Sequence, residues 1–169
     1  MKIIKATKED LSAMMHIIHQ AQEYLASLNI DQWQNGYPNE QKILEDIANQ
    51  ESYLIKNEQN QIIAITMFTT RNELTYAVIE GNWLTNDNTT YGVIHRMAVN
   101  NEYRNAGAAK FIFHYFEQLL KAENIVSMRI DTHQDNIGMQ HILTKLDYKY
   151  CGIIYLEDGN KRLAYEKII

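Results

Sequence analysis

Cysteine and proline are nearly absent from this chain of 169 residues, which contains one of each. A single cysteine, Cys151, has no intramolecular partner, which excludes the small disulfide-rich classes of protein. The 7 glycines and single proline also exclude collagen-like and low-complexity chains. With 46% hydrophobic residues and a formal net charge of −5, the composition differs from that of disordered chains. We therefore expect one globular domain over residues 1–169.

Long apolar runs are missing as well. No window approaches the roughly 18 uncharged apolar residues of a membrane span, and the start, MKIIKATKED, lacks the apolar stretch of a signal peptide. The mild acidic surplus is spread along the chain and indicates no nucleic-acid-binding face. We therefore expect a cytoplasmic protein without membrane or nucleic-acid partners. A small-molecule or peptide partner is expected, and a homodimer is left open.

Hydrophobic periodicity predicts the element order β α α β β β β α β α β β. This pattern indicates a mixed α/β fold, with one sheet flanked by helices. The connection between the strands at 91–99 and 125–131 is long enough to make them parallel neighbours. The predicted strands cover residues 2–6, 52–56, 61–68, 74–79, 91–99, 125–131, 148–156 and 161–167, and the predicted helices cover residues 8–28, 40–49, 104–119 and 136–146.

The segment after residue 96 is the most informative about chemistry. A predicted strand ends at Val99, and Arg104-x-x-Gly107-x-Ala109 opens a helix. Small residues let a ligand approach the backbone, and the free N–H groups of a first helical turn attract anions such as a pyrophosphate. A Walker loop and a three-glycine dinucleotide fingerprint are both missing. The alternative is an ordinary helix start rich in helix-forming alanine.

At these residues the chain resembles the GNAT superfamily of N-acetyltransferases. Met97-Ala98-Val99 is similar to the family's central strand, Arg104-x-x-Gly107-x-Ala109 to its acetyl-CoA motif, and Lys145-Leu146-Asp147-Tyr148 to its Lys-x-Gly-Phe ending. The resemblance implies a mostly antiparallel, twisted sheet with a splayed central parallel pair. It also implies direct transfer of acetyl from acetyl-CoA to a primary amine of an unidentified small molecule or peptide. The alternative is a non-catalytic CoA-binding sensor or interaction module.

The resemblance also assigns roles to individual residues. Strand backbone would meet the pantetheine arm and acetyl carbonyl, the loop and helix start would meet the phosphates, and Asn136 would hydrogen-bond the amide arm. Leu143 stands where the family often has a tyrosine as general acid, which leaves Tyr148, Tyr155 or water to protonate the thiolate. The expected cofactor-binding residues are Met97, Ala98, Val99, Arg104, Asn105, Ala106, Gly107, Ala108, Ala109 and Asn136.

Two residues are candidates for the acid–base chemistry of amide formation. An amine must be neutral to attack a thioester, so a general base is useful near pH 7. His95 is the preferred base because strand alternation places it on the same face as Met97, and its position resembles the strand histidine of arylalkylamine acetyltransferases. A half-buried structural histidine is the alternative. Glu80, beside Trp83, could attract a cationic amine, although surface charge explains it equally well.

Aromatic residues in loops or near strand ends are candidates for an acceptor pocket. In the family, the loop after the first helix and the central hairpin form the walls of this pocket, so its expected lining includes Trp33, Tyr37 and Trp83, with ordinary packing as the alternative. Asp131 is also expected there because it lies at the C-terminal end of a parallel strand, a usual place for ligand groups, with loop solvation as the alternative. No metal is expected, because His16 and His19 have no further ligands in their pattern. Cys151 lies in an apolar strand and is expected in the core rather than as an acyl-enzyme nucleophile.

Overall fold

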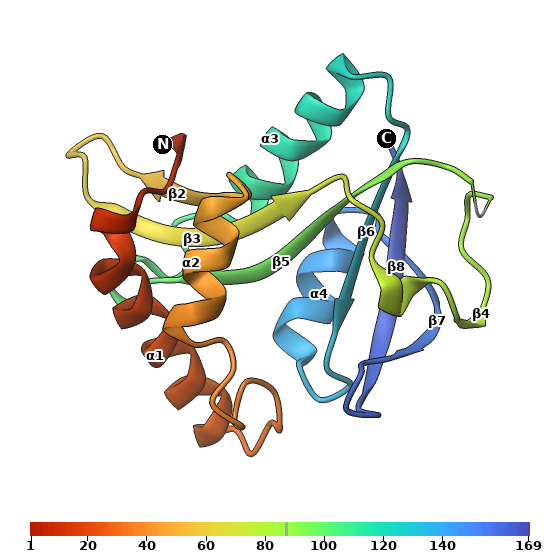
Figure 1. The fold of residues 1–169 in the computed structure, drawn as a ribbon, viewed down its shortest axis with the longest axis horizontal. Coiled ribbons are helices and arrows are strands. Elements are labelled where there is room, and N and C mark those ends of the chain that lie inside the picture. Colours follow the sequence, from red (N-terminus) through yellow and green to blue (C-terminus); the bar gives the residue numbers. More distant parts are fainter. Residues whose placement is uncertain (87) are drawn as a thin grey trace. The chain divides into compact units, whose positions relative to one another are not determined.

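The computed structural model describes residues 1–86 and 88–169 and contains the predicted order of helices and strands (Figure 1). Eight strands are hydrogen-bonded in the order β1-β2-β3-β5-β6-β8-β7-β4. The strands are β1 (Lys2–Lys5), β2 (Ser52–Lys56), β3 (Ile62–Thr69), β4 (Glu80–Gly81), β5 (Tyr91–Val99), β6 (Ser127–Thr132), β7 (Lys149–Tyr155) and β8 (Lys161–Ile168). The helices are α1 (Leu11–Ser27), α2 (Glu40–Ala48), α3 (Ala108–Ala122) and α4 (Ile137–Lys145), with 3₁₀ turns at Lys8–Asp10, Leu74–Tyr76 and Asn101–Tyr103.

The contacts divide the chain into two compact units, each built from two stretches of sequence. The first unit comprises Met1–Phe68 and Ile94–Phe113, and the second comprises Thr69–Val93 and His114–Ile169. The β5 strand therefore contributes residues to both units. Among the described residues, no helix is both long and apolar enough to cross a membrane.

In the first unit, α1 and α2 pack on the antiparallel strands β1, β2 and β3. The Thr7 amide donates to Asp10 Oδ2 at 2.9 Å just before α1, as expected for a helix start. The predicted apolar stripe of α1 is largely buried, but Leu28 is 50% exposed because the helix ends at Ser27. The core of this unit includes Met14, Ile18, Ile43, Ile47, Leu54 and Ile65.

In the second unit, β6, β8, β7 and β4 form antiparallel pairs. Tyr91–Val93 of β5 pairs in parallel with Ser127–Arg129 of β6, so the prediction of a mostly antiparallel sheet with one parallel pair is confirmed. The β4 and β7 backbones approach closely at two glycines. A Cβ on Gly81 would lie 2.1 Å from the Cys151 carbonyl oxygen, and one on Gly152 would lie 2.2 Å from that of Glu80. Glycine at both positions therefore allows β4 to pair with β7.

The predicted strand at 74–79 is wrong. Leu74–Tyr76 form a 3₁₀ turn, and strand pairing begins only at Glu80. Leu74 and Val78 are 81% and 75% exposed, whereas Tyr76 is buried. The β-forming composition did not determine the structure here, because strand propensity depends on packing against neighbouring strands.

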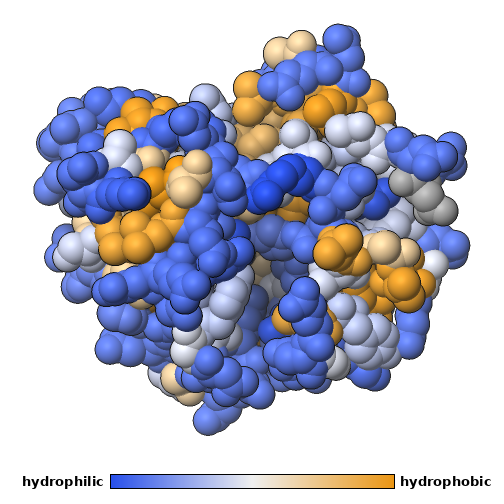
Figure 2. All heavy atoms as spheres, viewed as in Figure 1, coloured by the Kyte–Doolittle hydropathy of each residue, from blue (hydrophilic) through white to orange (hydrophobic). Residues whose placement is uncertain are grey.

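Figure 2 shows that hydrophilic side chains cover much of the face viewed, with separate hydrophobic patches between them.

The helix predicted from residue 104 begins four residues later, at Ala108. Asn105 and Gly107 have φ values of +67° and +82°, which a right-handed helix does not accommodate. The segment Arg104–Gly107 is therefore a loop. In the predicted turn at 86–90, Asp87 lies outside the described residues.

Candidate functional site

The first candidate region is the connection from β5 to α3, in the first unit. The Asn100 amide donates to the Ile63 carbonyl oxygen at 2.9 Å, which fixes the end of β5 to β3. The Asn100 side chain then accepts from the Glu102 amide at 3.1 Å and caps the 3₁₀ turn. The loop that follows is thus anchored directly beyond the strand.

This loop has the backbone geometry of an anion cradle. Gly107 has a φ of +82°, a conformation that strains other residues, and nothing lies within 4 Å of the position where its Cβ would be. The Phe111 amide donates to the Gly107 carbonyl oxygen at 3.0 Å, which marks the first turn of α3. The N–H groups at the start of a helix have no partner within the helix and carry partial positive charge. An open backbone at Gly107 and this helix start fit a phosphate group.

The Arg104 side chain extends from the same loop and is exposed. Its guanidinium carbon lies 3.9 Å from the centroid of the Tyr24 ring of α1. The neighbouring Asn101 amide donates to Gln20 Oε1, also on α1, at 2.9 Å. The connection between β5 and α3 is therefore held by α1 at two positions, Asn101 and Arg104.

Arg96 lies between His95 and Met97 and has a left-handed backbone, with φ of +50°. Regular alternation along β5 is interrupted at this residue, so the argument that placed His95 and Met97 on one face does not hold. The His95 side chain is half-buried, and its carbonyl oxygen accepts from Thr66 Oγ1 at 3.4 Å. Its role as a base stays a prediction.

The Arg96 side chain forms a buried ion pair that the sequence did not reveal. Its Nε and Nη2 donate to the two carboxylate oxygens of Asp46 on α2, at 2.6 and 2.9 Å. Burial raises the pKa of Asp46 above its ordinary value, despite the opposing effect of the Arg96 charge. The third nitrogen, Nη1, donates to the phenolic oxygen of Tyr37 at 2.6 Å. This contact brings one predicted acceptor residue, Tyr37, to the position in β5 where the backbone has a positive φ.

Trp33 comes from the same loop as Tyr37 but has a different environment. It is half-buried and packs against the hydrophobic core of the first unit. Packing therefore accounts for Trp33, whereas Tyr37 is exposed and fixed by a polar contact. Of the two residues, Tyr37 is the better candidate for ligand contact.

The predicted polar residues of the second unit form separate hydrogen-bonded pairs. The Tyr155 hydroxyl donates to Glu80 Oε1 at 2.7 Å, and this bond raises the pKa of Tyr155. The Tyr76 hydroxyl donates to Asp131 Oδ1 at 2.7 Å. Asn136 caps α4, because its Oδ1 accepts from the Met139 amide at 3.1 Å, and its contact with the cofactor stays a prediction.

Trp83 belongs to a buried cluster centred on Arg129. The Arg129 guanidinium carbon lies 4.3 Å from the Trp83 ring centroid and 4.0 Å from that of Tyr91. Arg129 Nε donates to Glu166 Oε1 at 3.2 Å, and Glu166 also accepts from Ser127, Thr85 and the Leu84 amide. Although burial alone raises it, these hydrogen bonds and the Arg129 charge hold the pKa of Glu166 below its ordinary value. The alternating pattern of β6 could have indicated Arg129, but nothing in the sequence indicated its partner.

The structure also bears on the proton donors considered for the thiolate. The Tyr148 hydroxyl is buried and donates to Glu117 at 3.2 Å, and burial raises its pKa, so it is a poor proton donor. Leu143 is fully buried and supplies no proton. Cys151 is buried as predicted, and burial raises its thiol pKa to about 11, which disfavours a nucleophilic thiolate. Tyr155 and water therefore remain as the candidate proton donors for the thiolate.

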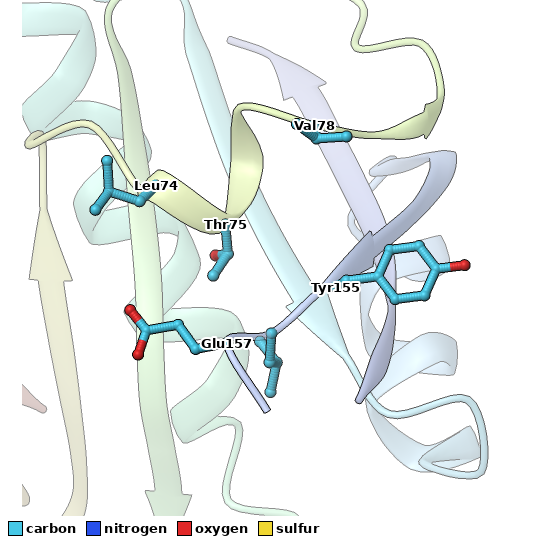
Figure 3. Close-up of a pocket in the computed structure, with 6 residues that line it drawn as sticks. Leu74, Thr75, Val78, Tyr155 and Glu157 are labelled. Carbon is cyan, nitrogen blue, oxygen red and sulfur yellow. The ribbon is translucent and has the colours of Figure 1, made fainter. Parts of the chain in front are cut away.

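The second unit also contains an open pocket of about 270 Å³. Figure 3 shows that the Tyr155 ring and the Glu157 carboxylate extend in opposite directions from it. No cluster of three or more potential metal-ligating His, Cys, Asp or Glu residues occurs among the described residues. The pocket is lined by Leu74, Thr75, Val78, Tyr155, Leu156 and Glu157.

Comparisons with known proteins agree with this geometry. A family model for the acetyltransferase (GNAT) family matches residues 15–148. A GNAT-family acetyltransferase structure from Streptococcus agalactiae is 34% identical, with a TM-score of 0.85, over 99% of this chain and 95% of that one. A putative acetyltransferase from Staphylococcus aureus is 22% identical, with a TM-score of 0.74, over 99% of both chains, and supports the fold alone. No curated protein matches the sequence.

The fold also occurs in a protein that acetylates another protein. The ribosomal-protein-alanine N-acetyltransferase from Brucella melitensis is 13% identical, with a TM-score of 0.69, over the full length of both chains. This identity is low enough that the match describes architecture only.

Proposed function

The chain belongs to the GNAT family of acetyltransferases, and from this premise we propose that it transfers acetyl from acetyl-CoA to a primary amine of a small molecule or peptide. The observation that carries the proposal is the β5–α3 connection, with positive φ at Asn105 and Gly107 directly before the helix start. Such a backbone approaches phosphate groups closely and presents N–H donors to them. The residues present therefore fit the CoA pyrophosphate.

The proposed contacts follow the strand, the loop and the helix in order. Acetyl-CoA would supply the acetyl group as an activated thioester. Backbone N–H groups at Met97 to Val99 would orient the pantetheine arm and polarise the acetyl carbonyl. The segment from Arg104 to Ala109 would hold the phosphates, and Asn136 would bind the amide arm. These assignments rest on the match to the family motif.

His95 is the proposed general base. An ammonium group has no lone pair, so the acceptor must lose a proton before nitrogen attacks the carbonyl carbon. His95 precedes Arg96, whose backbone is left-handed, and lies two residues before Met97. Glu80 is a second proposed contributor, because its exposed carboxylate could attract a cationic amine. Direct transfer needs no protein nucleophile, in agreement with the raised thiol pKa of Cys151.

One observation favours the alternative of a CoA-binding module without turnover. Leu143 is fully buried where related sequences often place a proton-donating tyrosine. A protein that binds CoA without transferring acetyl would release no free thiol when mixed with acetyl-CoA and amines. Measuring thiol release across a panel of polyamines, aminoglycosides, amino acids and peptides therefore separates the two functions.

The Gly107→Glu variant tests the cradle. A side chain at this φ is strained, and a carboxylate would repel phosphates, so acetyl-CoA should no longer stabilise the variant. In the parent protein, acetyl-CoA at 100 times its dissociation constant should raise the free energy of unfolding by about 2.7 kcal/mol. Thermal melting with and without acetyl-CoA measures the stabilisation of the parent protein and its loss in the variant. Gly159→Glu, at a glycine of the same φ in the β7–β8 turn, is the matched control. An unchanged parent melting temperature at millimolar CoA would contradict the assignment.

The His95→Ala variant tests the base. If His95 accepts the amine proton, turnover should fall by roughly 10²–10⁴ while affinity for acetyl-CoA is retained. Initial rates with acetyl-CoA and an amine acceptor measure this loss. A loss below threefold would assign proton removal to water or Glu80 instead.

A further inference from the structure

The contact between Tyr24 and Arg104 joins α1 to the loop before α3. The ring of Tyr24 is 45% exposed, and the Arg104 guanidinium lies over its face at 3.9 Å. Gln20, one helical turn earlier on α1, accepts from the Asn101 amide at 2.9 Å. Residues four positions apart lie on the same side of a helix. One face of α1 therefore holds both the start of the loop and its cationic side chain.

Stacking leaves the hydrogen-bonding capacity of arginine intact. A guanidinium group packs on an aromatic ring through its planar face, whereas its five N–H donors point outward in the plane. Arg96 and Arg129 use these N–H groups to donate to the buried carboxylates of Asp46 and Glu166. Within the described part of the chain, Arg104 has no carboxylate partner. Its donors and its charge are therefore available to an anionic ligand.

A fixed guanidinium binds more favourably than a mobile one. A free arginine side chain loses rotamer entropy when it binds a phosphate, and a partner that holds it beforehand reduces this cost. Tyr24 is the residue in contact with the Arg104 plane, and it belongs to a regular helix rather than to the loop. A residue of α1 thus holds the charged side chain of the loop.

We propose that Tyr24 is a positioning residue that holds Arg104 for the phosphate groups of CoA. The inference rests on the proposed function, and it adds a residue outside the sequence motif. Tyr24 itself need not touch the ligand. The aromatic ring of Tyr24, and not its hydroxyl group, would hold Arg104, because the guanidinium lies over the ring.

Calorimetric titration of CoA into the parent protein and two variants tests this inference. Tyr24→Leu should weaken CoA binding about three- to tenfold, because the platform for the guanidinium is lost. Tyr24→Phe should bind within about twofold of the parent, because the ring face is retained. Steady-state kinetics should show the same pattern in the KM for acetyl-CoA, with kcat unchanged. Tyr115→Leu, which removes another exposed helical tyrosine, should leave the affinity unchanged.

A double-mutant cycle assigns the effect to Arg104. In an Arg104→Gln background, Tyr24→Leu should cause no further loss of affinity. Unchanged or tighter binding by Tyr24→Leu, or a loss that persists without Arg104, would overturn the positioning role. Failure of the parent protein to bind CoA would instead contradict the proposed function, and this inference would fall with it.

Discussion

Each unit of the molecule contains a buried arginine–carboxylate pair, Arg96–Asp46 in the first and Arg129–Glu166 in the second, and the two carboxyl groups have opposite pKa shifts. Asp46 in the first unit and Glu166 in the second are 2% and 0% exposed, so both are removed from water. The pKa of Asp46 is raised, whereas that of Glu166 is lowered. Burial is the largest single influence in both cases and acts in the same direction. The difference therefore comes from the partners.

The number and chemistry of the hydrogen-bond donors explain this difference. Asp46 accepts from the Arg96 guanidinium, whose third nitrogen is directed to Tyr37. Glu166 accepts from Arg129 and also from two hydroxyl groups and two backbone amides. Every donor stabilises the charged form of a carboxylate, and several together outweigh the loss of hydration. Burial alone therefore does not predict the sign of a pKa shift.

The largest effect is expected for Glu166→Gln. The variant would leave the Arg129 charge buried without its carboxylate, which should lower the free energy of unfolding by about 3–5 kcal/mol. Because the folded pKa lies below the ordinary 4.5, the Glu166 contribution is present above that pH and is lost as pH falls through the folded value. Urea denaturation between pH 3 and 7 measures both effects. Glu157→Gln, at an exposed carboxylate, should change stability by less than about 0.5 kcal/mol.

A smaller loss is expected for Asp46→Asn, about 1 kcal/mol or less at neutral pH, because the raised pKa shows that the folded state favours the uncharged group that Asn resembles, which offsets the loss of the Arg96 partner. The folded pKa lies above the ordinary 3.8, so this group favours the folded state most at low pH and lowers its stability as pH rises through the folded value. Removing it should therefore make stability rise more steeply with pH in this interval. The same denaturation series tests the sign. A shallower dependence, as expected for Glu166→Gln, would break the contrast between the two pairs.

The smallest effect is expected for Tyr37→Phe. This variant removes the oxygen that accepts from Arg96 Nη1 but keeps both hydrogen bonds to Asp46. Stability should change by less than about 1 kcal/mol, because Tyr37 is exposed. If the contact orients the loop that carries Tyr37 for the acceptor, kcat/KM for the amine should fall about threefold to tenfold while KM for acetyl-CoA is unchanged. Equal activity of variant and parent would show that the Tyr37 contact is not needed for acceptor binding.

Local patterns predicted most of the fold. The apolar spacing of α2 and the β-branched residues of β2 and β5 indicated their types and nearly their ends, because the packing of these elements agrees with their periodicity. The strand predicted at 74–79 was wrong because packing and periodicity disagree there. Its apolar residues alternate as in a strand, but only Tyr76 is buried, and a hydrogen bond to Asp131 fixes it.

The candidate site was predictable where it is contiguous in sequence. The spacing of Arg104 and Gly107 drew attention to this segment, although it predicted a helix from residue 104 where the structure has a loop as far as Gly107. The pairing of Arg96 with Asp46 joins residues 50 positions apart, and the stack of Arg104 on Tyr24 joins two different elements. Nothing in the local pattern of either residue specifies such a partner. These contacts form only in the folded chain, and the order of helices and strands does not specify which side chains meet.

The division of the sequence between the two units has a consequence for synthesis. The first unit requires Ile94–Phe113 in addition to Met1–Phe68, and the intervening Thr69–Val93 belongs to the second. A nascent chain cannot complete its first unit before residue 113 has emerged, by which point part of the second unit has already been translated. A contiguous fragment that ends at Phe68 would lack the β5 residues and the start of α3. Truncation therefore cannot isolate the candidate phosphate-binding loop together with the helix that holds it unless residues of the other unit are carried along.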